Sequence, residues 1–258
     1  MKKMILSDID ARMIEAIIVR YGRIVSIHDL LTVFNTHYKS TSAHNRIQQL
    51  TESGWFIRIK QGLYLLNESL SLRYQSDISL LAICSILNKH AYISLAHALN
   101  YFNMFDQLSY TMVAFNTQQS KKYEWQQVVF KFVKIKPSMY YGFIEKTIDQ
   151  QQVKIAESEK ALIDYLYIDQ SFSTASLVFE KLSQHQQSLD MEKIQEYAAR
   201  SSETIKRKMG FFLDQLNVNT SYLYAQLKTD HKSYSRFTSD SSIFNAKWRL
   251  YYDQRIIE

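Results

Sequence analysis

The chain has 258 residues, of which 46% are hydrophobic and 14% aromatic. This is enough apolar material to form a core, and it excludes general disorder. One cysteine, Cys84, excludes a disulfide framework and a cysteine-based zinc site, and its apolar surroundings predict a buried helical thiol in a reducing compartment. No signal-like apolar run develops before Asp8, and no stretch approaches the ~18 apolar residues of a membrane span. The sequence therefore predicts a cytoplasmic protein with no membrane partner.

The net charge of +6 is unevenly distributed along the chain. Residues 1–66 carry nine Lys and Arg against five Asp and Glu, whereas the remaining 192 residues carry 22 against 20. An excess of positive charge concentrated in one segment is typical of a module that binds a polyanion. The charge thus favours nucleic acid as the partner of the first quarter.

Local signals predict three helices in this first quarter. Capping patterns open the first two, and a glycine follows the first and the third. Apolar residues then recur at helical spacing, including Ile27, Leu30, Leu31 and Phe34 on one face of the second helix. The predicted ranges are 7–21, 26–34 and 40–53.

The third helix has the composition of a recognition helix. Ala43, Ile47 and Leu50 form a narrow apolar stripe, and the opposite face is polar and free of acids in its first turns. Asn and Gln can contact adenine through two hydrogen bonds, and Arg suits guanine or phosphate. A helix N-terminus favours phosphate. The predicted DNA contacts on this helix are Thr41, Ser42, His44, Asn45, Arg46, Gln48 and Gln49.

A hairpin is predicted directly after this helix. Residues 55–60 and 63–66 read as strands, and the turn falls at Gln61-Gly62. Arg58, Lys60 and Gln61 lie at or near its tip and are predicted to contact the DNA backbone or minor groove. The three helices and hairpin together predict a winged helix-turn-helix over residues 1–68 that binds double-stranded DNA. A protein-binding or structural role for the same module is the alternative.

The larger region, residues 70–258, is predicted to be mixed. A helix is expected at about 71–90, an extended piece entering a helix at 91–99, and strands at 110–115, 127–135 and 152–156, with 118–124 as an exposed polar turn. Helices are expected at 157–167, 173–185, 190–200, 202–217 and 221–228, and a polar linker at 234–242. The fold class is therefore α+β: a winged helix followed by a mixed part (about 70–170) and a helix-rich part (about 171–258).

Little in this region points to catalysis. The five scattered glycines cannot build a phosphate-binding loop, and the seven histidines include no metal-binding pair. Glu157, Glu159, Lys160 and Asp164 suggest a Mg²⁺-dependent nuclease, although acids are stabilising at any helix start. We therefore predict no enzyme activity, no cofactor and no metal. The run Lys206, Arg207, Lys208 is a candidate antitoxicity or secondary nucleic-acid contact, with a solvated helix face as the alternative.

Short motifs spread over nearly the whole chain resemble the AbiEi-like antitoxins of bacterial type IV toxin–antitoxin (abortive infection) systems. The resemblance runs through Gly54-Trp-Phe-Ile-Arg-Ile-Lys-Gln-Gly-Leu-Tyr64, Tyr92-Ile-Ser-Leu-Ala-His-Ala-Leu99, Phe130-Lys-Phe-Val-Lys-Ile135, Tyr141-Gly-Phe143, Ala156-Glu-Ser-Glu-Lys-Ala-Leu-Ile-Asp164, Lys206-Arg-Lys-Met-Gly-Phe-Phe-Leu213 and Trp248-Arg-Leu-Tyr-Tyr-Asp253. Two departures are Ser158, where the family often has proline, and Phe102-Asn103-Met104, where it tends to read His-Gly-Leu.

The resemblance implies two activities. The winged helix would bind inverted repeats in the protein's own promoter and repress it, and the C-terminal domain would counteract a co-encoded nucleotidyltransferase-like toxin without requiring a stable complex. Two alternatives remain open: a metal-dependent nuclease directed to DNA, and a regulator that senses a small ligand and has no toxin partner.

Overall fold

The computed structural model describes residues 6–67, 78–107, 109–228 and 233–258. The chain divides into two compact units, Met1–Ile83 and Cys84–Glu258. The boundary predicted between residues 68 and 70 lies outside the described residues, as does the 71–77 part of the helix predicted at 71–90. Among the helices of the described segments, none is long and apolar enough to cross a membrane.

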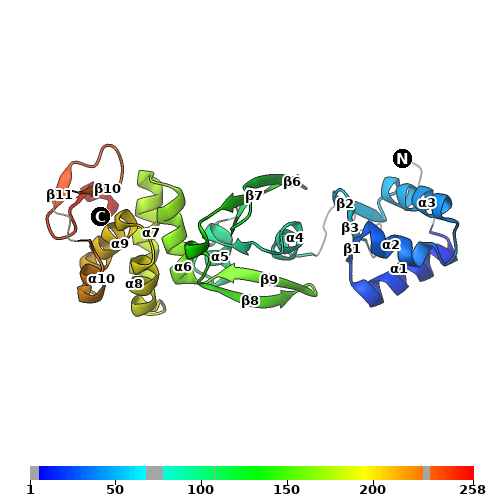
Figure 1. Cartoon of the computed structure of the whole chain (residues 1–258), viewed down its shortest axis with the longest axis horizontal. Helices are drawn as coiled ribbons and strands as arrows, with labels where there is room; N and C mark the ends of the chain where they lie inside the picture. Colours follow the sequence, from blue (N-terminus) through cyan, green and yellow to red (C-terminus); the bar gives the residue numbers. More distant parts are fainter. Residues whose placement is uncertain (1–5, 68–77, 108, 229–232) are drawn as a thin grey trace. The chain divides into compact units, whose positions relative to one another are not determined.

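The N-terminal unit combines a helical layer with a small antiparallel sheet whose strand order is β1-β3-β2 (Figure 1). The helices and the hairpin predicted from the sequence are confirmed, and a short first strand was not foreseen. The elements are α1 (Asp8–Tyr21), β1 (Ile24–Ser26), α2 (Ile27–Phe34), α3 (Ser40–Glu52), β2 (Phe56–Lys60) and β3 (Leu63–Leu66).

Local capping explains where these elements begin and turn. The Ser26 side chain accepts from the backbone N–H of Asp29, whose carboxylate accepts from the Ser26 N–H at 2.9 Å, which completes a capping box. Gly62 has φ +74°, a conformation that favours glycine, and forms the hairpin turn as predicted. The apolar faces of the helices meet those of the strands in one core around Leu30, Phe34 and Phe56, which are each at most 1% exposed.

The C-terminal unit contains a six-stranded mixed sheet of order β6-β7-β5-β4-β9-β8. The strands of this sheet and the helices between them are, in chain order, α4 (Leu80–Leu87), β4 (Tyr92–Ile93), α5 (Leu95–Tyr101), β5 (Thr111–Asn116), β6 (Lys121–Trp125), β7 (Val128–Lys134), η2 (Pro137–Met139), β8 (Phe143–Ile148) and β9 (Gln151–Ala156). Helix α4 straddles the division between the two units and carries the buried Cys84, as predicted.

The prediction of an exposed turn at 118–124 is wrong, because most of that segment belongs to β6. This strand lies at the sheet edge and pairs antiparallel with β7, so that Lys122 faces Lys131. Charged residues are common on edge strands, where they oppose pairing with another strand. In β6 they replace the alternation of apolar and polar residues by which a strand is predicted. Strand β8, which pairs with β9 along its full length, was also missed.

Helices follow the sheet (Figure 1): α6 (Ser158–Ile168), α7 (Phe172–Gln184), α8 (Met191–Ala199), α9 (Glu203–Gln215) and α10 (Ser221–Ala225). Helix α6 is central, because it contacts α5 and β9 as well as α7, α8 and α9. A small second sheet follows, of order β10-β12-β11: β10 (Ser235–Arg236), β11 (Ile243–Asn245), β12 (Leu250–Tyr252) and then η3 (Gln254–Ile256). The predicted α+β class is confirmed, although the predicted linker at 234–242 contains β10.

The end of the chain packs closely on α9 through Trp248. The indole is fully buried, and its Nε1 donates to the Asp214 carboxylate at 2.6 Å. A Cβ at Gly210 would lie 2.2 Å from two indole carbons, so this close approach requires glycine. Thus α9 lies between the other helices and the terminal strands, which matters for the charged residues it carries.

Candidate nucleic-acid interface

Helix α3 has one buried and one exposed face. Ala43, Ile47 and Leu50 point into the core and are each at most 2% exposed, as the apolar stripe predicted. One helical turn contains 3.6 residues, so the residues between these positions lie on the other side. The exposed set is Thr41, Ser42, His44, Asn45, Gln48 and Gln49.

The N-terminal half of α3 is suited to an anion. Its first turn contains no acid, and its N-cap residue, Lys39, makes no side-chain cap hydrogen bond. The first N–H groups of any helix have no intrahelical acceptor, and they form the positive end of the helix dipole. Within the described residues, the Asn45 side chain forms no hydrogen bond, whereas the Gln48 side chain donates to Glu52 at 2.9 Å. The acid on this face is therefore at the C-terminal end of the helix, away from its first turns.

Arg46 has a different role from the rest of the helix. Its guanidinium forms an ion pair with Asp10, which is fully buried, and Nε lies 3.1 Å and 3.2 Å from the two carboxylate oxygens. Ser7 and Tyr38 also donate to this carboxylate. Against the effect of burial, the Arg46 and Ser7 hydrogen bonds hold the pKa of Asp10 below its usual value. We therefore reassign Arg46 from the predicted guanine or phosphate contact to the packing of α3 on α1.

The hairpin presents a polar tip next in sequence to α3. Arg58 and Gln61 are exposed and Lys60 is half-buried. The register between β2 and β3 shifts between Arg58 and Lys60, which marks a bulge in the strand. Arg58 is paired with Tyr64 across the hairpin, so its side chain is placed on a strand and not on a loop. The strand fixes the backbone of Arg58, so only the rotamers of its side chain would have to be ordered when it binds a phosphate.

The predicted basic patch at residues 206–208 is wrong. Arg207 is 3% and Lys208 1% exposed, and Lys206 is paired with Glu203 at 2.9 Å. The segment around β10 covers α9 and explains this burial, because the Arg207 guanidinium donates to Ser233 and the Lys208 ammonium donates to the Phe237 carbonyl at 3.2 Å. Burial lowers the pKa of Lys208 to about 8. This run therefore joins α9 to the terminal strands, and it offers no surface to nucleic acid.

The carboxylates that suggested a nuclease are each held by protein groups. Glu157 accepts from Lys193 at 3.0 Å and from the Tyr197 hydroxyl. Glu159 accepts from the backbone N–H of Asp190 at 3.0 Å. No group of three or more His, Cys, Asp or Glu side chains suited to a metal occurs within residues 6–67, 78–107, 109–228 and 233–258.

The remaining carboxylate, Asp164, lies in a buried polar cluster between the sheet and α6. It pairs with Lys160 one helical turn away, and both side chains are at most 2% exposed. The hydroxyls of Ser94 and Tyr92 donate to it at 2.8 Å and 3.2 Å. Burial raises the pKa of Asp164, and the Lys160 ammonium opposes that rise. The carboxylate and both hydroxyls of this cluster form hydrogen bonds with one another or with Lys160. Such a self-contained set is typical of a buried ion pair with a structural role.

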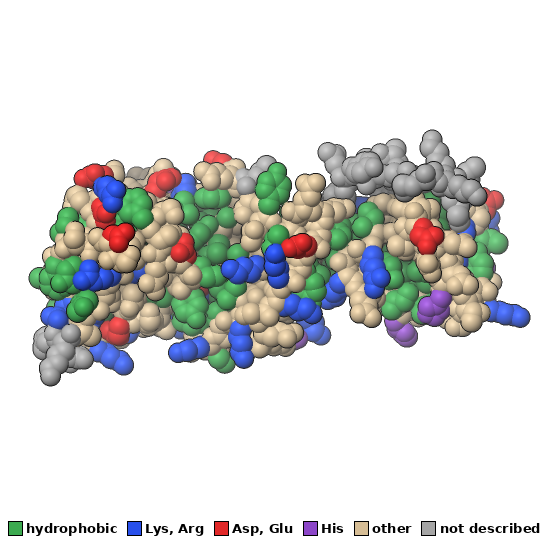
Figure 2. Space-filling model, turned by 90° about the horizontal axis from the view of Figure 1, so that it is seen from above, with side chains coloured by type: hydrophobic (Ala, Val, Ile, Leu, Met, Phe, Trp, Pro, Cys, Tyr) green, Lys and Arg blue, Asp and Glu red, His purple; other side chains and the backbone are tan. Residues whose placement is uncertain are grey.

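A second concentration of positive charge lies on the sheet of the C-terminal unit, and it was not predicted from the sequence. Residues 111–156 carry seven Lys and three Asp or Glu. Figure 2 shows mostly basic side chains over this sheet, whereas acidic and basic side chains are mixed over the helices of the same unit. The excess of lysine is visible in the sequence when charge is counted over segments of about 50 residues, because the more acidic helices that follow are then counted separately. The exposed lysines are Lys121, Lys122, Lys131, Lys134, Lys136 and Lys146.

Comparison with known proteins identifies the fold alone. No protein-family model matches the sequence, and no curated protein is detectably similar to it. The crystal structure of the Rv2827c protein from Mycobacterium tuberculosis is similar, with a TM-score of 0.66 at 12% sequence identity. The match covers 95% of this chain and 92% of that one, so the arrangement of elements is shared across nearly the full length.

Proposed function

We propose that this protein is a non-enzymatic bacterial antitoxin and transcriptional autorepressor that binds double-stranded DNA of its own promoter through an N-terminal winged helix-turn-helix. The observation that carries the DNA-binding part is the exposed polar face of α3, whose first turns lack acids, followed by a hairpin with an exposed arginine. The antitoxin part depends on the resemblance described above.

The order of elements supports the winged-helix assignment. A winged helix places three helices and a hairpin in one chain segment, with a short strand between the first two helices, and the elements α1-β1-α2-α3-β2-β3 follow this order. In this fold the third helix enters the major groove with its N-terminal residues toward the bases. Asn45 and Gln48 would then meet base edges, Thr41 and Ser42 a phosphate, and the hairpin the backbone.

Two substitutions separate base reading from phosphate contact. We expect Asn45→Ala to lose about ten-fold in affinity for the promoter but little for unrelated DNA, because a good bidentate base contact contributes ~1–3 kcal/mol. We expect Arg58→Gln to weaken binding to every sequence and to reduce the slope of log K against log salt by about one, because one fewer counterion is released. Fluorescence titrations at several salt concentrations measure both.

The matched control is Arg12→Gln, which removes an exposed cation from α1 without touching α3 or the hairpin. It should leave specific affinity and salt slope unchanged to within about two-fold. Equal losses for Asn45→Ala on promoter and unrelated DNA would contradict the assignment of α3 as the reading helix. An unchanged slope for Arg58→Gln would remove the hairpin from the interface.

The lysines of the sheet are a better secondary nucleic-acid contact than the buried run at 206–208. Lys131 and Lys134 are exposed on β7, and cations at such positions bind phosphates without reading sequence. In the same titrations we expect Lys131→Gln with Lys134→Gln to lower the slope by up to about two for long promoter fragments. Lys89→Gln, an exposed lysine outside the sheet, is the control. Slopes equal to the control's would exclude the sheet from DNA contact.

The antitoxin part is tested by co-expression with the neighbouring gene, which we expect to encode a nucleotidyltransferase-like toxin. The full chain should restore growth, and the DNA-binding variant Asn45→Ala with Arg58→Gln should restore it equally while no longer repressing a promoter reporter. This result would separate the two activities within one folded chain. Growth arrest that persists with the wild-type protein would refute the antitoxin assignment and leave the DNA-binding one standing.

A further inference from the structure

The small sheet at the end of the chain has one covered face and one open face. Leu250 and Ser235 lie opposite each other on β12 and β10, and both are buried where these strands contact α9. Successive side chains of a strand point to opposite faces of its sheet. The set Arg236, Tyr251 and Phe244 therefore lies on the other face, and the register of the three strands places it in one row.

This row is an aromatic surface that contains a cation. The central carbon of the Arg236 guanidinium lies 4.0 Å from the centre of the Tyr251 ring, and one of its nitrogens donates to the Ser241 carbonyl at 2.7 Å. The rings of Phe244 and Tyr234 have their centres 4.9 Å and 5.4 Å from that of Tyr251. These contacts order the rings and the guanidinium before any ligand arrives, which lowers the entropic cost of binding.

Much of this surface is open to solvent and positively charged. Tyr234 is 56% exposed and Phe244 43% exposed, and Arg236 is exposed as well. Within the described parts of the chain, Arg236 and the neighbouring Arg249 donate to backbone carbonyls and not to carboxylates. Residues 233–252 carry three Lys or Arg and one Asp. The open face thus combines accessible rings with guanidinium groups whose charge is not neutralised by an acid.

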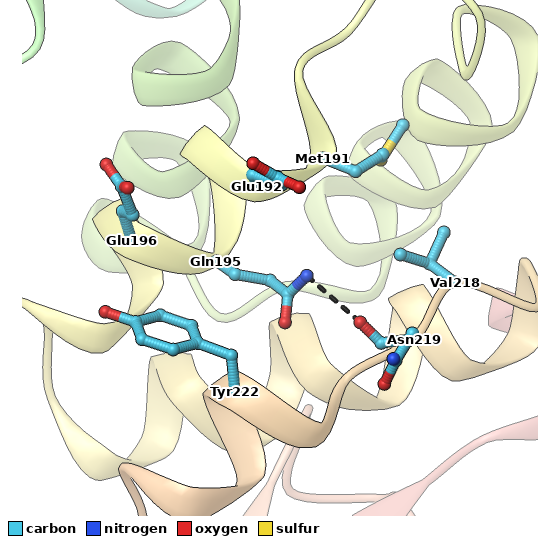
Figure 3. Close-up of a pocket in the computed structure, with 7 residues that line it drawn as sticks. All are labelled: Met191, Glu192, Gln195, Glu196, Val218, Asn219 and Tyr222. Carbon is cyan, nitrogen blue, oxygen red and sulfur yellow. Dashed lines mark hydrogen bonds between the residues drawn. The ribbon is translucent and has the colours of Figure 1, made fainter.

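A pocket of about 540 Å³ in the same unit, between α8 and the segment that leads into α10, has the opposite charge (Figure 3). Glu192 and Glu196, which line it, are exposed and one helical turn apart on α8. Tyr222, 52% exposed, lines the same pocket. Two carboxylates repel phosphate groups, so an exposed ring in this pocket is a poor site for a nucleic acid. Exposed rings and positive charge occur together on the terminal sheet instead.

We propose that the open face of β10, β11 and β12 binds single-stranded RNA. Unpaired bases stack on aromatic rings and on guanidinium planes, and cations beside the rings bind the phosphates. The three strands have only two or three residues each, whereas a stable protein interface takes ~20–30 residues a side. A few nucleotides therefore fit this face better than a protein does. The exposed Tyr234 hydroxyl suits the ribose 2′-hydroxyl, which DNA lacks.

The test titrates the full-length ¹⁵N-labelled protein with a uridine oligomer of about eight nucleotides, a length within the usual range for single-strand sites. A thymidine oligomer and an abasic phosphodiester strand of the same length are titrated in parallel. We expect the uridine oligomer to shift amide signals of β10, β11 and β12. It should bind at least about five-fold more tightly than the abasic strand, because one stacked base contributes at least that much. It should also bind more tightly than the thymidine oligomer.

Substitutions of exposed side chains separate stacking from charge. Phe244→Ala and Tyr234→Ala should each weaken binding of the uridine oligomer about five-fold or more, whereas Phe244→Tyr keeps a ring and should bind like wild type. Arg236→Gln should reduce the slope of log K against log salt by about 0.7, because one phosphate contact is lost. The matched control is Tyr222→Ala, which removes a similarly exposed ring beside the two carboxylates and should not change binding. Thermal unfolding checks that each variant is folded.

Equal affinity for the abasic strand would show that only phosphates are bound, and it would overturn the proposal. Binding of the thymidine oligomer that is as tight or tighter, or amide shifts confined to α3 or to the lysine-bearing β7, would overturn it too. So would unchanged affinity in both ring-to-alanine variants. A blocked oligoglutamate peptide that shifts the same amides with equal affinity would assign this face to a polypeptide instead. None of these results decides whether the N-terminal unit binds promoter DNA.

Discussion

Replacing Lys160 by methionine is expected to lower the free energy of unfolding of the C-terminal unit by about 3–5 kcal/mol. The ammonium is fully buried and is the countercharge of Asp164, which is itself 1% exposed. Methionine fills similar space, so little of the loss would come from packing. The loss comes from leaving a carboxylate buried without a cation. Urea unfolding followed by segment-resolved hydrogen exchange measures it.

The pH dependence of this variant has a defined sign. Without Lys160, only the Ser94 and Tyr92 hydrogen bonds oppose the effect of burial, so the pKa of Asp164 lies further above the value in the unfolded chain. A group with a raised pKa in the folded state takes up a proton on folding, so stability increases as the pH falls toward the unfolded value. The difference in stability from wild type should therefore be smaller at pH 5 than at pH 8.

A second substitution tests whether the charge is the cause. Lys160→Met with Asp164→Asn removes both charges and keeps an acceptor for the Ser94 hydroxyl, so it should recover at least half of the loss. Lys89→Met, at an exposed position, is the control and should change stability by no more than about 0.5 kcal/mol. A loss below 1 kcal/mol for the single variant, or no recovery in the double variant, would contradict this account.

Arg46→Ala is expected to destabilise the N-terminal unit by about 2–3 kcal/mol. The expected loss is smaller than for Lys160, because the Arg46 side chain keeps 17% exposure while Asp10 is fully buried. Ser7 and Tyr38 still donate to the carboxylate after the change. Hydrogen exchange of the backbone amides of α1 and α3 reports the local loss, and Arg12→Ala on α1 is the control.

The acid dependence follows from the lowered pKa of Asp10. A carboxyl whose pKa is lowered by folding stabilises the protein above its unfolded pKa, and this contribution is lost as the pH falls below about 4. Arg46→Ala removes the main cause of the lowering, so the stabilities of wild type and variant should converge in acid. A constant difference from pH 7 to pH 3 would show that lost packing, and not the ion pair, accounts for the effect.

The same residue bears on the DNA-binding proposal. Arg46→Ala should weaken promoter binding only because α3 loses its support on α1. Arg46→Gln with Asp10→Asn replaces the ion pair by neutral groups that can still hydrogen-bond, and it should bind the promoter within about three-fold of wild type. A folded double variant with a larger defect would return Arg46 to the DNA contacts.

Local signals in the sequence were sufficient for the three helices and the hairpin of the N-terminal unit, but not for strand β1. The capping pair Ser26 and Asp29 and the turn glycine Gly62 act within a few residues, so neighbours in the chain determine the outcome. The burial of Ala43, Ile47 and Leu50 followed from helical spacing for the same reason. The polar face of α3 could be located in this way, although its role in DNA binding remains a prediction.

Tertiary structure alone decided which charged side chains face solvent. Arg46 pairs with the carboxylate of Asp10, 36 residues earlier in the chain, and Lys208 donates to the carbonyl of Phe237, 29 residues later. Strand β6 is held by its register with β7, which its own charged sequence does not specify. Whether a charged side chain is solvated or buried depends on residues that are distant in the sequence and become its neighbours only in the folded chain. The sequence by itself therefore determined the helices, the hairpin and the apolar faces, and the three-dimensional packing decided the exposed surface on which the candidate sites depend.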